Sequence, residues 1–350
     1  MLGPVTHYLP LTVIRRERIL PQPGKVVVRA GQKVSALDVI AETDLNSEYL
    51  LLDLSHSLQI PAEKIERYLQ CQLGDQLTQG DVIAGPVGIA NRVVRAPKDG
   101  RVILSDSGQL LLEIAGKNFQ LKAGIPGEVV ELIADRGAVV ETTGALIQGV
   151  WGNGKIDFGV MSVLAKYPNM SLVPADLDVS LRGSIVLGGM CSDAEVLKEA
   201  EGLPLRGLIL GSLSPRLLQA ASRMQIPVMV IEGFGERSIN PIVFKLLTTN
   251  DRREVVLNAE YWDRYSGVRP ELVIPLPAPG GSAIPQETIF FDQNQTVRII
   301  RGPSAGQIGQ INRVKASMSF PGGLRAPGAE IQREDGEKFI IPLANLEIIA

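Results

Sequence analysis

The sequence contains few of the residues from which catalytic and metal sites are usually built. Its 350 residues include only 2 cysteines and 2 histidines, and 5% are aromatic. Cys71 and Cys191 lie too far apart in the chain to form a disulfide framework or a cysteine-based metal cluster. His7 and His56 leave little material for zinc hydrolysis or Ser–His catalysis. We therefore expect no catalytic residue, no metal and no cofactor.

Long apolar runs and an excess of positive charge are also missing. The longest apolar stretches, such as Ile226–Ile231, fall far short of the ~20 residues of a membrane span. No basic segment precedes an apolar one at the N-terminus, as a secretory signal would require. With 35 Lys+Arg against 38 Asp+Glu, any nucleic-acid binding must come from a local patch. The composition predicts a cytoplasmic protein of two or three domains without membrane association.

The first 150 residues contain a self-similar pattern. The stretch from Gly31 to Ala41 reappears between Gly74 and Ala84, and a looser copy runs from Gly137 to Ile147. Each copy adjoins a Pro/Gly turn and a strand of alternating apolar residues. Such period-2 alternation predicts short strands with one buried face, and hence a compact β-sandwich or barrel over residues 1–150. One helix is predicted within it, over Pro61–Leu69.

The repeated motif Pro-Gly-x-Val…Gly-x-x-Val-x-x-x-Asp-Val-Ile-Ala resembles half of a lipoyl- or biotinyl-type barrel-sandwich hybrid. In the cofactor-carrying members of that family, a lysine in a hairpin is the attachment point. Here the residues after Ala41 and after Ala84 offer no such lysine. The resemblance therefore implies a docking module without an attached cofactor.

A glycine-dense segment, Gly149–Gly159, follows this region. It departs from the phosphate-binding loop pattern because Ile156 follows Lys155, where serine or threonine is required. We interpret the segment as a tight turn before the next domain.

Residues 151–285 alternate between apolar strands and helical segments. Strands are predicted near 184–189, 208–211 and 227–232, each followed by a helix. Fully apolar strands joined by helices indicate a parallel sheet covered on both faces. Two further strands, near Glu254–Asn258 and Glu271–Pro275, close this α/β domain.

The predicted strand ends carry glycine and serine just before helix N-termini. Open parallel sheets bind ligands at this edge, and free backbone N–H groups there favour anions. A small anionic ligand could therefore lie among Gly188, Gly189, Ser192, Gly211, Ser212, Ser214, Glu232, Gly233 and Gly235. The alternative is that these residues only form the turns and helix caps that any such fold needs.

The same edge offers some acid–base candidates. Asp193, Glu232 and Glu236 are carboxylates there, and Arg237 lies close by in sequence. Cys191 precedes a helix start, where thiolates are favoured, but a buried structural thiol is the competing interpretation. The main hypothesis remains non-enzymatic.

The C-terminal segment, residues 286–350, contains the most specific motif. Thr296–Val314 has a strand, a Gly-Pro turn at Gly302, glycines at 306 and 309, and a second alternating strand. It resembles the KOW motif closely, with an insertion at Ser317–Gly328. The resemblance implies an SH3-like barrel that contacts RNA, ribosomal proteins or RNA polymerase.

A cluster of positive charge supports that implication. Between residues 297 and 329 there are five cations and no acid, and Phe320 could stack on a base. The predicted binding residues are Arg298, Arg301, Arg313, Lys315, Phe320 and Arg325. A protein partner and purely structural packing remain open as alternatives.

The sequence thus predicts a multi-domain α/β plus β protein: a barrel-sandwich-like β domain, a central parallel α/β domain and a KOW SH3-like barrel. Its expected function is that of a binding scaffold associating with RNA or with a transcription or translation assembly. The alternative is a small-anion binding protein or enzyme that uses the carboxyl-edge crevice of the α/β domain. The sequence does not indicate an oligomeric state.

Overall fold

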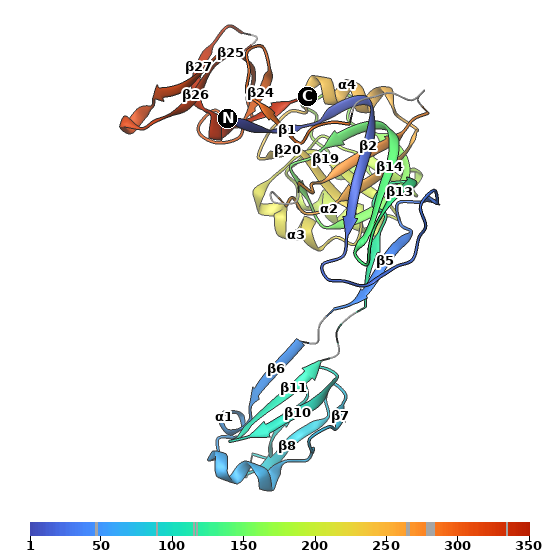
Figure 1. Ribbon diagram of the computed structural model, residues 1–350, viewed down its shortest axis with the longest axis vertical. Coiled ribbons are helices and arrows are strands. Elements are labelled where there is room, and N and C mark those ends of the chain that lie inside the picture. Colours follow the sequence, from blue (N-terminus) through green and yellow to red (C-terminus); the bar gives the residue numbers. More distant parts are fainter. Residues whose placement is uncertain are drawn as a thin grey trace.

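The computed structural model describes residues 1–45, 48–88, 90–114, 116, 118–263, 267–277, 284–333 and 335–350. The protein is mostly β, with 49% of residues in strands and 15% in helices, and the strands form several sheets. Figure 1 shows a large central body, a C-terminal sheet beside it, and a smaller β unit that stands away from both. No helix in these ranges is long and apolar enough to cross a membrane.

The central body is built on a 12-stranded sheet. Strands β16, β17, β19 and β20 are parallel to one another, whereas β21 and β22 are antiparallel to their neighbours. The predicted α/β alternation and the two closing strands are confirmed. In spatial order the strands are β15 (Trp151–Gly152), β20 (Val228–Phe234), β19 (Gly207–Leu213), β17 (Ser184–Leu187), β16 (Lys155–Val163), β21 (Glu254–Ala259), β22 (Glu271–Pro275), β14 (Gly137–Gln148), β13 (Gly127–Ile133) and β4 (Lys33–Val34), with β18 (Met190–Cys191) on β19 and β2 (Tyr8–Ile19) on β14.

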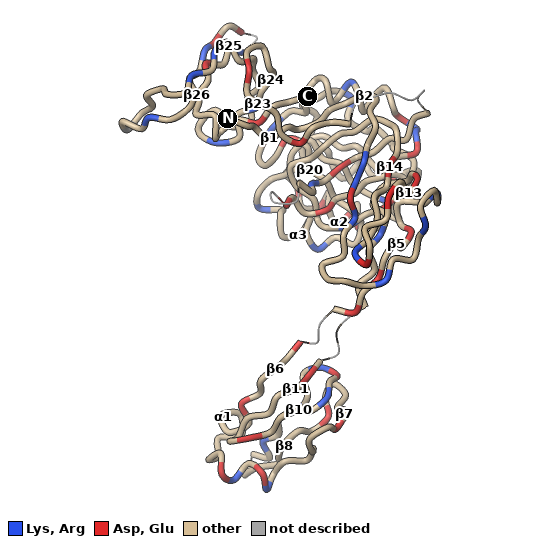
Figure 2. The backbone as a smooth tube through the Cα atoms, in the orientation of Figure 1, with Lys and Arg blue, Asp and Glu red and all other residues tan. Residues whose placement is uncertain are grey.

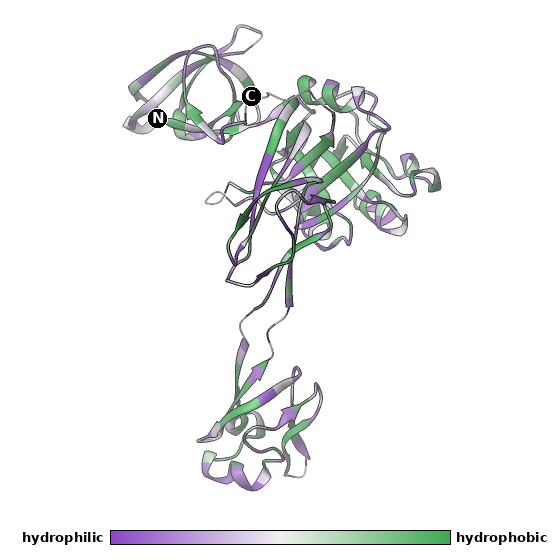
Figure 3. Cartoon of the chain, turned by 45° about the vertical axis from the view of Figure 1, so that its right-hand side comes forward, coloured by the Kyte–Doolittle hydropathy of each residue, from purple (hydrophilic) through white to green (hydrophobic). Residues whose placement is uncertain are grey.

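Helices cover both faces of the parallel strands. Successive side chains of a strand point to opposite faces, so each strand packs against helices on both sides. On β17, for example, Val186 packs towards α2 and α3, whereas Ile185 packs towards α4. Figure 3 shows hydrophobic residues gathered in this sheet. The helices of this body are η2 (Pro174–Asp176), η3 (Val179–Leu181), α2 (Ala194–Gly202), η4 (Pro215–Leu217), α3 (Leu218–Arg223) and α4 (Pro241–Thr249).

The glycine-dense segment Gly149–Gly159 lies within this body and is not a turn throughout: it contains β15 and the first part of β16, and only the predicted tight turn between them is confirmed. That turn joins β15 to β16 at Asn153 and Gly154, and Gly154 has a φ of +78°. The Asn153 side chain is buried, donates to the carbonyl of Ile226 at 2.8 Å and accepts from the N–H of Val228 at 3.0 Å. Asn153 therefore ties the turn to the chain entering β20.

Residues 48–114 form the smaller β unit, with a hydrophobic core of their own. Its sheet has the order β6-β11-β10-β7, and β8 pairs with β9 as a hairpin. The helix predicted from Pro61 is a 3-10 helix, and a short α-helix before it was not predicted. The elements are β6 (Glu48–Asp53), α1 (Leu54–Leu58), η1 (Ala62–Tyr68), β7 (Gln76–Leu77), β8 (Val82–Val87), β9 (Arg92–Arg95), β10 (Gly100–Asp106) and β11 (Gln109–Ile114).

The first two copies of the sequence repeat have the same local structure. In one, the N–H of Ser35 donates to Asp38 Oδ2 at 2.7 Å; in the other, the N–H of Thr78 donates to Asp81 Oδ2 at 2.8 Å. A short strand precedes each turn, and it pairs with a strand whose first residue is a glycine. Strand β4 pairs with β13 at Gly127, and β7 pairs with β10 at Gly100. The looser third copy is instead part of the long strand β14.

One copy is inserted into the other. Strand β5 (Val39–Asp44) pairs with β12 (Asn118–Lys122) and with β3 (Lys25–Val26), and the 48–114 unit lies in the chain between β5 and β12. Residues 1–150 are not one compact sandwich, because β14 pairs with β2, β13 and β22 and so merges the outer copy with the central sheet.

The C-terminal sheet includes the first strand of the chain. Strand β1 (Leu2–Thr6) pairs in parallel with β28, so that Val5 lies opposite Ile348. The sheet is open at β23 and β27, and no closed barrel is found within the described ranges. Its order is β23 (Thr288–Phe290), β1, β28 (Leu346–Ile349), β24 (Thr296–Ile299), β25 (Ile308–Ser319), β26 (Arg325–Gln332) and β27 (Lys338–Pro342), with η5 (Pro321–Gly323) and η6 (Leu343–Asn345).

Two hairpins of this sheet match the sequence pattern. The long pair β25–β26 projects from the body (Figure 1) and turns at η5, within the predicted insertion. Strands β26 and β27 turn near Asp335 and Gly336, where the predicted hairpin lies; Gly336 has a φ of +85°. Glu334 of that motif lies outside the described residues.

Candidate functional site

The glycines predicted to line a crevice at the carboxyl edge lie where chain segments touch. A Cβ at Gly189 would lie 1.7 Å from the carbonyl oxygen of Met170, and one at Gly188 would lie 2.7 Å from Leu172 Cδ2. A Cβ at Gly211 would lie 2.5 Å from Ile239 Cγ1. These glycines permit close backbone packing and leave no room for a ligand, so this part of the predicted crevice is filled.

The remaining predicted edge residues mainly shape the turns. Ser212 is buried, and its Oγ accepts from the N–H of Arg237 at 3.2 Å. The N–H of Gly235 donates to the carbonyl of Leu213 at 3.0 Å, and that of Ser214 to the carbonyl of Cys191 at 2.8 Å. Ser192 is exposed before α2. This matches the alternative interpretation, in which these residues form turns.

The acid–base candidates near α2 have structural partners. Asp193 caps α2 by accepting from the N–H of Glu195 at 3.0 Å. Burial raises the pKa of the Cys191 thiol to about 11, so the thiol stays protonated at neutral pH. Glu236 is exposed on the turn after β20. None of these groups forms a nucleophile–base pair in the described structure.

Two of the predicted edge residues, Glu232 and Gly233, do line a cavity. It has a volume of about 420 Å³ and lies between the carboxyl end of β20 and strands β24 and β28 of the C-terminal sheet. The cavity thus brings together residues from both predicted binding sets. Its lining residues are Val150, Glu232, Gly233, Phe234, Arg237, Trp262, Arg298, Ile299, Ile300, Arg301 and Glu347.

A buried ion network forms part of the cavity wall. Arg298 Nη1 donates to Glu232 Oε2 at 2.7 Å, and its Nε donates to Glu347 Oε1. The second oxygens are also occupied: Thr6 Oγ1 donates to Glu347 at 3.0 Å and the Asn240 N–H donates to Glu232 at 2.8 Å. All five residues are buried, so the network joins the central body to the C-terminal sheet through β1, β24 and β28.

The prediction that Arg298 belongs to an exposed basic patch is wrong. Its exposed fraction is 2%, because the face of β24 that carries it packs against the end of β20. Burial alone would lower the pKa of Arg298, but the Tyr8 phenol and the two carboxylates raise it above its ordinary value. Arg298 is therefore a permanently charged group between two carboxylates.

Two other arginines of the cavity have no such partner. Neither Arg237 nor Arg301 forms an ion pair with a carboxylate of the described residues. Arg237 Nε donates to the carbonyl of Phe234 at 3.0 Å, and its guanidinium lies against the loop at Gly306. Arg301 is exposed at the start of that loop.

Sequence comparison does not place this site in a known family. No protein-family model and no curated protein matches the chain. The geometry of the described residues therefore carries the functional argument.

The remaining predicted cations lie on or beside the projecting hairpin β25–β26. Arg313, Lys315 and Arg325 are exposed, and Figure 2 shows basic residues along this hairpin. Arg313 is paired across the strands with Glu330, whose carboxylate lies 3.1 Å from Lys338 Nζ. The structure thus brings three of the predicted cations onto one hairpin and separates them from Arg298.

Phe320 is only half-buried, but its ring is already used in packing. A Cβ at Gly328 would lie 2.6 Å from Phe320 Cζ, so the ring covers the glycine on the opposite strand. The ring stabilises the end of the hairpin, and we do not count it among the exposed binding groups.

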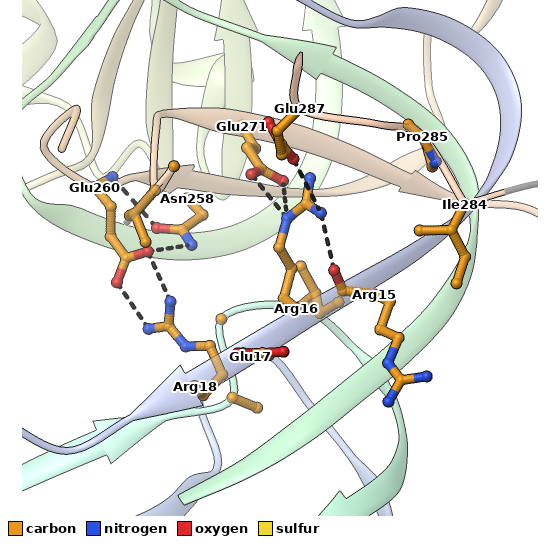
Figure 4. Close-up of a pocket in the computed structure, with 15 residues that line it drawn as sticks. Arg15, Arg16, Glu17, Arg18, Asn258, Glu260, Glu271, Ile284, Pro285 and Glu287 are labelled. Carbon is orange, nitrogen blue, oxygen red and sulfur yellow. Dashed lines mark hydrogen bonds and ion pairs between the residues drawn. The ribbon is translucent and has the colours of Figure 1, made fainter. Parts of the chain in front are cut away.

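A second cavity, of about 320 Å³, was not predicted (Figure 4). Arg16 Nε lies 2.9 and 3.0 Å from the two Glu271 oxygens. Arg18 forms a two-bond pair with Glu260, both bonds being 2.7 Å. These paired charges fasten β2 to the segments around β21 and β22.

The pKa values in this second cavity follow from those pairs. Burial would raise the pKa of Glu260, but the bonds from Arg18 lower it below its ordinary value. Burial raises the pKa of Glu287, which lies 3.9 Å from Arg16.

The only sequence signal for this second cavity was the charged cluster Arg15-Arg16-Glu17-Arg18, whose partners lie more than 100 residues away in the chain. Because its charges are mutually paired, we interpret this cavity as structural.

Proposed function

We propose that this protein is a non-enzymatic RNA-binding scaffold that uses the hairpin β25–β26 of its C-terminal sheet. The observation that carries the proposal is the charge of this hairpin. The hairpin, residues 308–332, contains three cations, Arg313, Lys315 and Arg325, and one acid, Glu330, which lies 3.1 Å from Lys338 on the neighbouring strand. All three are exposed, and the hairpin projects where a nucleic-acid strand can reach it.

The arrangement of the C-terminal strands supports a KOW-type, SH3-like unit. Strands β24 to β28 occur in the order β28-β24-β25-β26-β27, and a 3-10 helix, η6, precedes the last strand. In the motif turn, Gly302 and Gly306 have φ values of +100° and +90°, which favour glycine. These features agree with the motif that the sequence resembles.

In this proposal the two nested repeat units act as docking modules of the scaffold. Their matching aspartate turns support the resemblance to barrel-sandwich hybrids. Between β8 and β9 the sequence has no lysine to which a cofactor could be attached. The small unit at residues 48–114 also has its own core and stands clear of the central body (Figure 1), which gives it access to a partner.

Charge reversal of the hairpin tests this function. The triple variant Arg313→Glu, Lys315→Glu, Arg325→Glu is expected to weaken binding of a labelled single-stranded RNA by about a hundredfold, since each reversal removes one phosphate contact and adds a repulsion. The slope of log K against log salt is expected to fall by about 2, at ~0.7 per contact. Fluorescence anisotropy at several salt concentrations measures both.

A matched variant separates local from global charge. Lys64→Glu, Arg67→Glu, Arg182→Glu changes the net charge equally at exposed sites outside the C-terminal sheet, and is expected to keep wild-type affinity. Equal RNA binding by the two triple variants would rule out the hairpin. Recovery of ribosomal or polymerase subunits from lysate after ribonuclease treatment, lost in the hairpin variant, would reassign the hairpin to a protein partner.

A further inference from the structure

The cavity between the central body and the C-terminal sheet has the size and position of a ligand site. Its volume of about 420 Å³ lies within the ~300–1,000 Å³ typical of small-molecule sites. It opens beside Glu232 and Gly233, where the parallel strand β20 ends, and open parallel sheets bind ligands at this edge. The neighbouring strand ends at Gly189 and Gly211 are filled, so the site is confined to β20.

The charges of this cavity favour an anion. Its lining has three arginines and two glutamates, and the two glutamates are both bonded to Arg298. Arg237 and Arg301 are left without a carboxylate partner in the described ranges. A guanidinium binds phosphate and carboxylate through paired N–H groups, so these two side chains can hold one anionic group between them.

The rest of the lining is apolar and includes a tryptophan. Val150, Phe234, Ile299 and Ile300 contribute hydrophobic surface beside Trp262. The Trp262 ring lies over the guanidinium of Arg269, with 4.7 Å between the guanidinium carbon and the ring centroid. Arg269 is buried and donates to the carbonyls of Val5 and Gly149, so the guanidinium that contacts the Trp262 ring is held in place.

We propose that this cavity binds a small organic anion that carries a planar ring. The ring lies against Trp262, and the phosphate or carboxylate lies between Arg237 and Arg301. Because the lining comes from both the central body and the C-terminal sheet, the ligand contacts both and holds them together. The site is separate from the hairpin β25–β26, so it goes beyond the RNA-binding function and does not depend on it.

Trp262 provides a direct reporter of binding. The chain has 2 tryptophans, and Trp151→Phe leaves Trp262 alone. In that background we expect AMP or UMP, or the aromatic carboxylates nicotinate or 4-hydroxybenzoate, to change the Trp262 fluorescence saturably at millimolar concentration or below. The same anion is expected to raise the melting temperature, because it binds the folded state. The neutral adenosine and uridine controls are expected to have little effect.

Variants of the free arginine test the assignment. Arg301→Glu is expected to weaken binding of the responding anion by at least about tenfold, the effect of losing a charged hydrogen bond. Arg313→Glu, an equal charge change on the hairpin, is expected to leave the affinity unchanged. A response to phosphates alone identifies an organic phosphate, and a response to carboxylates alone an organic acid. The proposal is wrong if none of the four anions binds, or if Arg301→Glu binds them as the wild type does.

Discussion

Replacement of Arg298 by methionine is expected to lower the free energy of unfolding by about 3–5 kcal/mol, because it leaves two buried carboxylates without their counter-charge. Glu232 and Glu347 are 7% and 1% exposed, and both are bonded to the guanidinium. Among the described residues, the hydroxyl of Thr6 and the N–H of Asn240 also bond these carboxylates, but neither group carries a positive charge. Urea denaturation followed by Trp262 fluorescence, in the Trp151→Phe background, measures the loss.

Two controls establish that the buried charge is responsible. Arg301→Met removes an exposed arginine three residues further along the chain and is expected to change stability by less than about 0.5 kcal/mol. Combining Arg298→Met with Glu232→Leu and Glu347→Leu is expected to restore most of the lost stability, because no unpaired charge then remains. Wild-type stability of Arg298→Met alone would show that the network does not join the two parts.

Acidification is expected to destabilise the protein through His7, by about 3 kcal/mol at most, since a shift of one pKa unit corresponds to 1.36 kcal/mol. Burial and the positive charges of Arg16 and Arg269 lower the pKa of His7 from 6.5 to about 4. Between these values the unfolded chain binds a proton that the folded protein does not. The contribution of His7 is therefore complete above pH 6.5 and is lost as the pH falls to about 4.

The difference between wild type and a His7 variant isolates this contribution from the carboxylates that titrate nearby. His7→Phe is expected to have a shallower fall in unfolding free energy across that pH range, measured by urea denaturation at a series of pH values. His56→Gln, which removes the other, exposed histidine, serves as the control. Parallel pH profiles for wild type and His7→Phe would contradict the assignment. The expected losses of unfolding free energy from Arg298→Met and from acidification through His7 are both larger than the ~0.5 kcal/mol typical of surface substitutions.

Local patterns in the sequence predicted the central strands well. Apolar runs such as Ile185–Leu187 and Leu208–Leu210, bounded by glycine, became parallel strands because both of their faces are buried. The first two copies of the repeat share a sequence and also a turn: Asp38 and Asp81 each accept a hydrogen bond from a backbone N–H three residues earlier. In these places the information lies within a few residues of the element it specifies.

Contacts between distant segments could not be predicted in the same way. Alternation on β24 places Val297 and Ile299 in the core and Arg298 on the other face, which the sequence pattern predicts to be solvent-exposed. That face is covered by the end of β20, more than 60 residues earlier in the chain. The pairing of β1 with β28 is likewise non-local. The candidate cavity depends on both contacts, so of its lining only Glu232, Gly233, Arg298 and Arg301 were predicted as binding residues, with Arg237 noted beside the acid–base candidates.

The insertion of one repeat unit into the hairpin of the other makes the inserted unit separable from the rest of the chain. In the register of β5 and β12, Asp44 lies opposite Asn118, and at the base of the inserted unit Glu48 lies opposite Ile114. Both ends of the insertion therefore meet at neighbouring points. The inserted unit can therefore be lengthened, replaced or removed without disturbing either core, as is typical of insertions at loop tips. A shortened gene that joins Asp44 to Asn118 through an Asn-Gly turn would encode the outer unit and the central body without the inserted unit.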